Sequence, residues 1–133
     1  ARKCLAYLTI EHKGAIPVEY REALGDRVFG CDDCLDVCPW NKWAVATRVA
    51  HFAPRPHPPL RETLAWTDEQ FLAHFKGTPV ERLGLARWRR NALTILGNVG
   101  SQADLPAAEA QLVSADPMVA EHAAWAVGRL RAR

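Results

Sequence analysis

The feature that most constrains this chain is a run of three cysteines within eight residues, Cys31, Cys34 and Cys38. Thiolates separated by two and three residues in a tight turn can converge on one metal centre. Gly30, directly before the run, lets backbone N–H groups approach the sulfur atoms because it has no side chain. Pro39, directly after it, stops the turn from continuing as a helix. We therefore expect a metal-binding turn around which the rest of the chain is arranged.

The spacing Cys-x2-Cys-x3-Cys-Pro is the end of the run with which bacterial ferredoxins hold 4Fe-4S clusters. The first cysteine of that run is replaced here by Val28, and Cys4, the only other cysteine, is the obvious substitute. In two-cluster ferredoxins the cysteine before the proline binds the other cluster. The pattern predicts one cluster held by Cys4, Cys31 and Cys34 with a fourth ligand from elsewhere, and a second cluster that takes Cys38. The chain is accordingly expected to be a fragment that follows an upstream cysteine run.

Other interpretations of the four thiols remain open at this point. They could form a tetrahedral zinc site, a self-contained 4Fe-4S cluster, or plain structural thiols. The ending Cys38-Pro39 favours iron–sulfur over zinc. Disulfides are disfavoured, since the spacing is that of metal ligands and no signal peptide is visible.

The composition is ordinary for a water-soluble chain with one domain or two small ones. Of its 133 residues, 49% are hydrophobic and 24% are charged, and the net charge of +2 does not by itself indicate nucleic-acid binding. No apolar run is long enough to span a membrane, and no targeting segment is visible. Reduced cysteines, the lack of a visible signal segment and an oxygen-sensitive kind of metal site point to the cytoplasm. Ala1 in place of methionine indicates that the true N-terminus lies elsewhere.

We expect a mainly α chain in three parts. Residues 1–50 are predicted to be the second half of a 4Fe-4S ferredoxin-like domain, residues 51–61 a proline-rich linker, and residues 62–133 HEAT-like helical repeats. The linker prediction depends on four of the nine prolines, which fall between residues 51 and 59 and favour a stiff, extended backbone. Two histidines in that stretch, His51 and His57, are expected to be solvated rather than metal ligands.

Within the first part, residues 4–10 have the weak alternation and the composition of a short strand. Residues 17–24 are predicted to form a short helix that ends at Gly25. Another short helix is expected after Pro39. Its tryptophans, Trp40 and Trp43, would shield the cluster from water or be core aromatics, and the two roles do not exclude each other.

Beyond the linker, Thr67 and Gln70 predict a capping box at the start of a helix that runs to about Lys76, with Trp66 packed on Phe71. The next segment has apolar residues at helical spacing, namely Leu85, Trp88, Ala92, Ile95, Leu96 and Val99.

An internal repeat follows, because residues 90–98 can be superposed on residues 121–129 with a shift of 31 positions. Between them, Asp104 is expected to cap a helix over residues 105–113, and Asp116, followed by a proline, is expected to open the last helix. Paired helices at this period predict a HEAT-like solenoid.

Arginines gather at two places one repeat apart. In a solenoid such positions line one surface, so they could form a ridge for phosphate groups; a solvated helix face is the alternative. We call this set the arginine ridge: Arg82, Arg87, Arg89, Arg90, Arg129, Arg131 and Arg133.

Residues 2–14, RKCLAYLTIEHKG, and residues 30–41, GCDDCLDVCPWN, followed by paired helices, resemble the C-terminal portion of the epoxyqueuosine reductase family. The resemblance covers nearly the whole chain. The order of the two cysteine motifs with this intervening text is far more specific than any single motif.

The resemblance implies an N-terminal cobalamin-binding domain, a ferredoxin-like domain with two 4Fe-4S clusters, and a C-terminal HEAT-like domain. Members of the family are oxidoreductases that convert epoxyqueuosine to queuosine at the wobble position of tRNAs with a GUN anticodon. Electrons from a reduced donor pass through the outer cluster and then the inner one and reduce the cobalt of cob(II)alamin; the low-valent cobalt, or its adduct, then acts on the epoxide. The family's ligand assignment agrees with the one above: Cys4, Cys31 and Cys34 join an upstream cysteine on the inner cluster, and Cys38 completes the outer one.

The resemblance also implies further site residues. Both clusters are expected to be incomplete in this chain, which should be inactive alone and has no assigned catalytic residue. Ala6, Cys31 and Asp32 are implied as neighbours of cobalamin. The full-length protein is expected to be a monomer without a membrane partner. Contacts to tRNA are implied at Thr9, Glu11, His12, Lys13, Arg87, Arg89 and Arg90.

Three functions are thus in competition. The preferred one is the redox and tRNA-binding part of a cobalamin-dependent tRNA-modifying reductase. The others are a non-enzymatic, zinc-stapled HEAT-repeat binding module and a stand-alone ferredoxin-type electron carrier.

Overall fold

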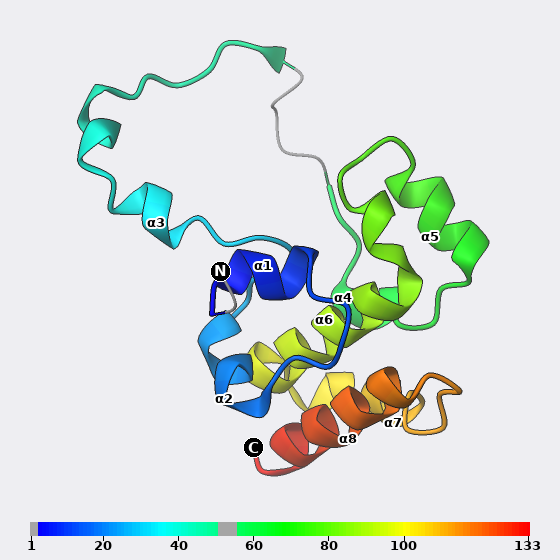
Figure 1. Ribbon diagram of the computed structural model, residues 1–133. Coiled ribbons are helices and arrows are strands. Elements are labelled where there is room, and N and C mark those ends of the chain that lie inside the picture. Colours follow the sequence, from blue (N-terminus) through cyan, green and yellow to red (C-terminus); the bar gives the residue numbers. More distant parts are fainter. Residues whose placement is uncertain (1–2, 51–55) are drawn as a thin grey trace.

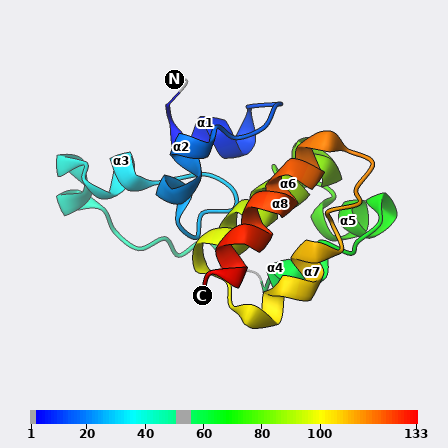
Figure 2. The same ribbon diagram turned by 90° about the horizontal axis from the view of Figure 1, so that it is seen from below.

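The computed structural model describes residues 3–50 and 56–133, and within these ranges the chain is helical, with no strand. A helical body surrounds α6 (Gly84–Val99), and the cysteine-bearing segment after residue 30 runs away from that body in both views (Figures 1 and 2). In these ranges no helix combines the length and apolar character needed to cross a bilayer.

The centre of the body is the pair formed by α6 and α8 (Pro117–Arg131), which lie side by side in Figure 2. Their contact is close at Gly97, where a Cβ atom would lie 2.3 Å from Cζ3 of Trp125. A glycine is therefore required at this crossing. The two helices and their neighbours bury one apolar cluster: Leu64, Ala92, Leu93, Leu96, Ala108, Val119, Ala123, Ala126, Val127 and Leu130.

The capping box predicted at Thr67 is confirmed. Thr67 N donates to Gln70 Oε1 at 2.9 Å, and Gln70 N donates to Thr67 Oγ1 at 3.3 Å, at the start of α5 (Asp68–Phe75). Trp66 packs against the apolar cluster that contains Phe71 and Trp88. α4 (Leu60–Thr63) precedes α5, and η4 (Glu81–Leu83) joins α5 to α6.

The strand expected over residues 4–10 is wrong, because these residues form α1 (Leu5–Ile10). A weak alternation over so few residues does not distinguish a strand from a helix, and burial decides the outcome. Leu8 and Thr9 are buried, and the Thr9 hydroxyl donates to the Leu5 carbonyl one turn earlier at 3.0 Å.

The helix predicted over residues 17–24 is confirmed as α2 (Val18–Arg21) followed by η1 (Glu22–Leu24). Gly25 ends it with a φ of +56°, in the left-handed region that favours glycine. Ile16 and Leu24 are fully buried against Ile95 of α6. The N-terminal segment therefore shares a core with the helical part, and the domain boundaries given above remain a prediction.

The cysteine-bearing arm contains α3 (Asp33–Asp36) and η2 (Pro39–Trp43). The short helix predicted after Pro39 is thus present as a 3₁₀ helix. The ring centroids of its two tryptophans lie 4.8 Å apart. Trp40 is 73% exposed and Trp43 is 59% exposed, so the interpretation of these residues as core aromatics is wrong.

At the C-terminal side, Asp116 accepts a hydrogen bond from Met118 N at 2.9 Å and caps α8 as predicted. Asp104 does not cap α7 (Leu105–Glu109), which is also shorter than expected. Its carboxylate instead accepts from Ser101 N at 2.8 Å, as part of a capping box at η5 (Gln102–Asp104). Pro106, two residues after Asp104, has no N–H to donate to that carboxylate. The predicted linker residues 51–55, including His51, lie outside the described residues, while His57 is exposed.

Candidate iron–sulfur site

All four cysteines are free thiols that lie at or near the protein surface. Cys4 is exposed at the N-cap of α1, and Cys34 is exposed within α3. Cys31 and Cys38, on either side of α3, are half-buried. Reduced thiols are the donors that iron–sulfur clusters require, so the chemistry of this donor set fits such a cluster.

The turn before the cysteine run is fixed at Gly30. Gly30 has a φ of +86°, which an L side chain rarely adopts, and its N–H donates to Thr9 Oγ1 at 3.0 Å. After it, Asp32 O accepts from Leu35 N at 2.8 Å, which closes the first turn of α3. The loop is thus fixed on α1 at one end and hydrogen-bonded locally at the other.

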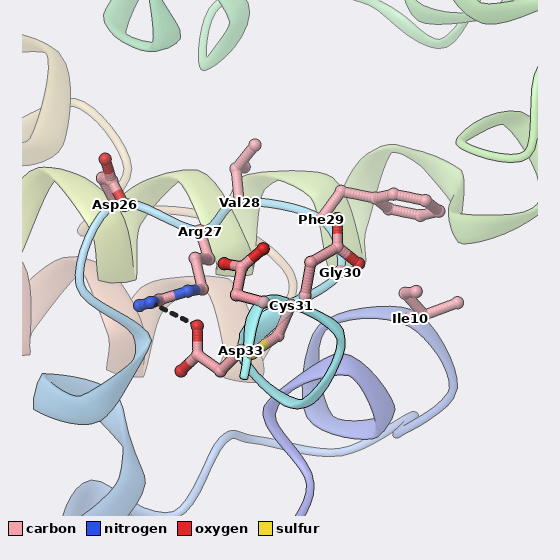
Figure 3. A pocket seen from close by; sticks show the side chains of 10 residues that line it. Ile10, Asp26, Arg27, Val28, Phe29, Gly30, Cys31 and Asp33 are labelled. Carbon is pink, nitrogen blue, oxygen red and sulfur yellow. Dashed lines mark hydrogen bonds and ion pairs between the residues drawn. The ribbon is translucent and has the colours of Figure 1, made fainter. Parts of the chain in front are cut away.

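An open hollow of about 630 Å³ lies beside this turn, and Cys31 is part of its lining (Figure 3). Arg27 Nη2 donates to Asp33 Oδ1 at 2.6 Å. This hydrogen bond is the main reason why the pKa of Arg27 is raised. Ile10 of α1 also lines the hollow. The hollow is therefore bounded by both segments that carry the predicted inner-cluster ligands.

Within residues 3–50 and 56–133, no three His, Cys, Asp or Glu side chains are close enough together to hold a metal ion. The division of the four thiols between two clusters remains a prediction.

Two buried polar residues of α6, which the sequence analysis did not assign to this site, anchor the cysteine-bearing segments. Asn91 Nδ2 donates to Thr9 O at 2.8 Å and to Val28 O at 2.9 Å. Arg90 Nη2 donates to Leu8 O at 2.9 Å. Their position as polar residues on an otherwise apolar helix face is a signal in the sequence that could have identified them as buried anchors.

Arg90, which the resemblance implies as a tRNA contact, is fully buried. Its guanidinium also donates to His12 O and Gly14 O, both at 2.7 Å. Burial lowers the pKa of Arg90 to about 10, with a smaller effect from Arg87, so the group stays charged at neutral pH. Thr9 is buried as well, so neither side chain faces a surface on which RNA could bind.

The other implied tRNA residues lie mostly around the loop that follows α1. Glu11 pairs with Arg82 at 2.8 Å, and Arg87 donates to Ile10 O at 3.2 Å. His12 and Lys13 continue this loop, Lys13 being exposed. Arg89 is elsewhere, since it donates to carbonyls near α5, Leu64 O at 3.0 Å and Trp66 O at 2.6 Å.

The C-terminal half of the arginine ridge also makes contacts within the protein. Arg129 pairs with Glu22 at 3.3 Å, and Arg131 pairs with Glu109 at 2.6 Å. Arg133 donates to backbone carbonyls at the end of α6. These exposed pairs reduce the positive charge that the ridge offers to a ligand.

The comparisons with known proteins agree with this site. Residues 1–41 match a family model described as a 4Fe-4S double cluster binding domain. The chain is 46% identical to epoxyqueuosine reductase of Pseudomonas aeruginosa, over 97% of this chain and 37% of the relative. It is 41% identical to epoxyqueuosine reductase of Escherichia coli K12, over 97% of this chain and 35% of the relative.

Solved structures give the same result. A crystal structure of epoxyqueuosine reductase with an epoxyqueuosine-modified tRNA-Tyr stem loop superposes with a TM-score of 0.84 at 30% identity, covering 96% of this chain and 35% of that one. The Bacillus subtilis epoxyqueuosine reductase gives a TM-score of 0.83 at 31% identity, with the same coverage.

The chain spans little more than a third of the length of the relatives it matches. Its cysteine motifs, its helical fold and its similarity along almost its whole length all lead to one assignment. This chain belongs to the epoxyqueuosine reductase family, and it carries an iron–sulfur segment of that family together with the helices that follow it.

Proposed function

We propose that this chain is the electron-relay and tRNA-binding part of an oxidoreductase that reduces epoxyqueuosine to queuosine at the wobble position of tRNA. The observation that carries the proposal is the 46% identity to an epoxyqueuosine reductase over 97% of the chain. A zinc-stapled binding module or a stand-alone carrier has no comparable support.

In this proposal Cys4, Cys31 and Cys34, with one cysteine from outside the chain, hold the inner 4Fe-4S cluster, and Cys38 binds the outer one. The match to a double cluster binding domain supports this division. The clusters, when bound, supply one-electron transfer. The chain's own contribution is to present the thiolates from a turn that Gly30 and its neighbours fix.

Ala6, Cys31 and Asp32 are proposed to lie next to cob(II)alamin, which the rest of the longer protein would bind. Ala6 and Cys31 are half-buried and Asp32 is exposed, so all three retain accessible surface. The open hollow beside Cys31 leaves room for a neighbouring group. The proposed location is the cytoplasm, where the tRNA substrate is found.

The proposed tRNA surface is the loop after α1 together with Arg87. It includes Glu11, His12 and Lys13, and Arg89 extends it toward α5. Arg90 is proposed to act from beneath, since it donates to His12 O and Gly14 O of this loop. Thr9 is proposed to act from the end of α1, the helix that leads into the loop. The relative solved with a modified tRNA stem loop supports tRNA as the partner. The paired helices behind this surface are proposed to be HEAT-like.

The test uses the complete polypeptide encoded by the gene, reconstituted anaerobically with iron and sulfide. We expect EPR signals of reducible 4Fe-4S clusters and, with cobalamin and a chemical reductant, conversion of an epoxyqueuosine-containing anticodon stem loop. Zinc at full occupancy with no reducible iron would refute the proposal. Clusters without binding to the stem loop would favour a stand-alone carrier instead.

A further inference from the structure

The side chain of Asn91 joins two segments that lead to different thiols. One of its carbonyl partners is Thr9, in the helix that begins directly after Cys4. The other is Val28, three residues before Cys31. Asn91 is fully buried, so these two hydrogen bonds do not compete with water.

Arg90 fixes the orientation of this amide. Asn91 Oδ1 accepts from Arg90 Nε at 3.0 Å and from Nη2 at 2.9 Å, which places the amide nitrogen toward the two carbonyls. The remaining donors of Arg90 bind Leu8 O, His12 O and Gly14 O. Because all of its hydrogen-bonding atoms have partners, the Asn91 amide has a single well-defined position.

A further hydrogen bond ties the same two segments together. Thr9 Oγ1 accepts from Gly30 N at 3.0 Å, while the Thr9 hydroxyl donates back to Leu5 O within α1. Gly30 directly precedes Cys31. The turn before Cys31 and the helix after Cys4 are thus held to each other by one buried network that centres on α6.

We propose that Asn91 is a positioning residue for the iron–sulfur cluster that Cys4 and Cys31 share. The inference rests on the proposed function, because it requires that cluster. Ligands from two distant places in the sequence can share a cluster only if their backbones are held at a fixed separation. Hydrogen bonds behind the ligands provide this, and such outer contacts also tune the potential of the metal centre.

The helix itself offers a matched control. Asn98, two turns further along α6, uses its amide in the same way, donating to Arg21 O at 2.6 Å and to Gly25 O at 3.1 Å. Those carbonyls belong to the end of α2 and η1, which carry no cysteine. Asn91→Asp and Asn98→Asp therefore remove the same number of donors, and only the first removes them from the cysteine-bearing segments.

The experiment compares both variants with the wild-type complete polypeptide after anaerobic reconstitution. For Asn91→Asp we expect about tenfold faster iron release to a chelator and a shifted reduction midpoint in an EPR titration. For Asn98→Asp we expect a lower thermal midpoint with wild-type iron release and a wild-type reduction midpoint. A merely structural role for Asn91 would not produce this difference.

Thr9→Val provides a second test if Asn91→Asp does not fold, because it keeps the shape of the side chain and removes only the hydroxyl. It should shift the reduction midpoint in the same way, and Thr9→Ser should restore it. Equal iron release and equal midpoints in the Asn91 or Thr9 variants and in Asn98→Asp would overturn the inference. A wild-type protein that takes up no reducible iron would instead overturn the proposed function.

Discussion

At the scale of single residues, the junction between the N-terminal segment and α8 contains one buried, neutral imidazole, that of His122. Ile16 N donates to His122 Nε2 at 3.2 Å, and His122 Nδ1 lies 2.8 Å from Met118 O. Since Nε2 accepts, the network assigns the proton to Nδ1. Burial is the main reason why the pKa of His122 falls to about 4; Arg21 lowers it further, while Met118 O and Glu121 act against the shift.

This pKa predicts that the protein loses stability in mild acid. The pKa of His122 is 6.5 in the unfolded chain and about 4 in the folded one, so the unfolded chain binds more protons between these values. The contribution of the neutral side chain is complete above pH 6.5 and is lost as the pH falls toward 4. It amounts to roughly 3 kcal/mol over this window.

Urea unfolding measured across this pH range tests the prediction, with His122→Gln as the variant that cannot titrate. The free energy of unfolding of the wild type should fall more steeply than that of the variant. Parallel pH profiles for the two proteins would contradict the assignment of the proton uptake to His122.

At the scale of elements, the pair of α6 and α8 requires a glycine in one helix and not in the other. Gly97 and Gly128 occupy the same position of the internal repeat. A Cβ at Gly97 would lie 2.3 Å from Trp125 and 3.2 Å from the Cα of Ala126, whereas a Cβ at Gly128 meets nothing within 4 Å. The two copies of the sequence repeat therefore pack differently at this position.

Alanine substitutions at the two positions should have opposite effects. Gly97→Ala is expected to lower the free energy of unfolding by about 1–3 kcal/mol, because the helices must move apart. Gly128→Ala should raise it by up to about 1 kcal/mol, since alanine favours helix more than glycine does. Chemical denaturation measures both, and a loss of stability in Gly128→Ala equal to that in Gly97→Ala would contradict the packing described here.

The elements that sequence patterns predicted correctly are those with local chemical signals. Thr67 and Asp116 cap helices through donors two or three residues away, so the necessary information lies within a few positions. The segment of residues 4–10 had no such signal, and its helical state depends on burial against a helix some eighty residues further along. Asp104 was misassigned because it completes the capping box of the preceding η5, where its carboxylate accepts from Ser101 N.

The same distinction applies to the candidate site. The 4Fe-4S character of the cysteine run could be predicted from its spacing and from the proline that follows it, because these signals lie within a few residues of one another. Asn91 and Arg90 could not, since their partners lie 63 to 82 positions earlier in the chain. What the sequence did offer was the presence of polar residues in an apolar helix, which indicates buried hydrogen bonds without naming their partners.

At the scale of the whole molecule, the cysteine-bearing arm projects from the helical body (Figure 1). Several arginines of the ridge bind carbonyls or carboxylates of the protein itself. Exposed Lys13, in the loop after α1, is therefore the cation in the proposed tRNA surface best suited to a phosphate.

Lys13→Ala should weaken binding of an anticodon stem loop and reduce the dependence of affinity on salt concentration by about one unit of log–log slope. Lys42→Ala is the matched control, because Lys42 lies on the arm and stacks on Trp43 at 4.1 Å. Gel-shift titrations at several salt concentrations provide the measurement. A wild-type affinity that does not respond to salt would remove this loop from the proposed tRNA surface.

The central claim is that Cys38 serves a different cluster from Cys4, Cys31 and Cys34, and that both clusters need cysteines from outside this chain. Iron analysis and EPR of the complete polypeptide with Cys38→Ala, beside Cys34→Ala, test it most directly. We predict that each variant loses half of its iron and that the two retain clusters with different EPR spectra. Full iron content in Cys38→Ala, or a complete reducible cluster assembled by this chain from its own four thiols, would contradict the claim.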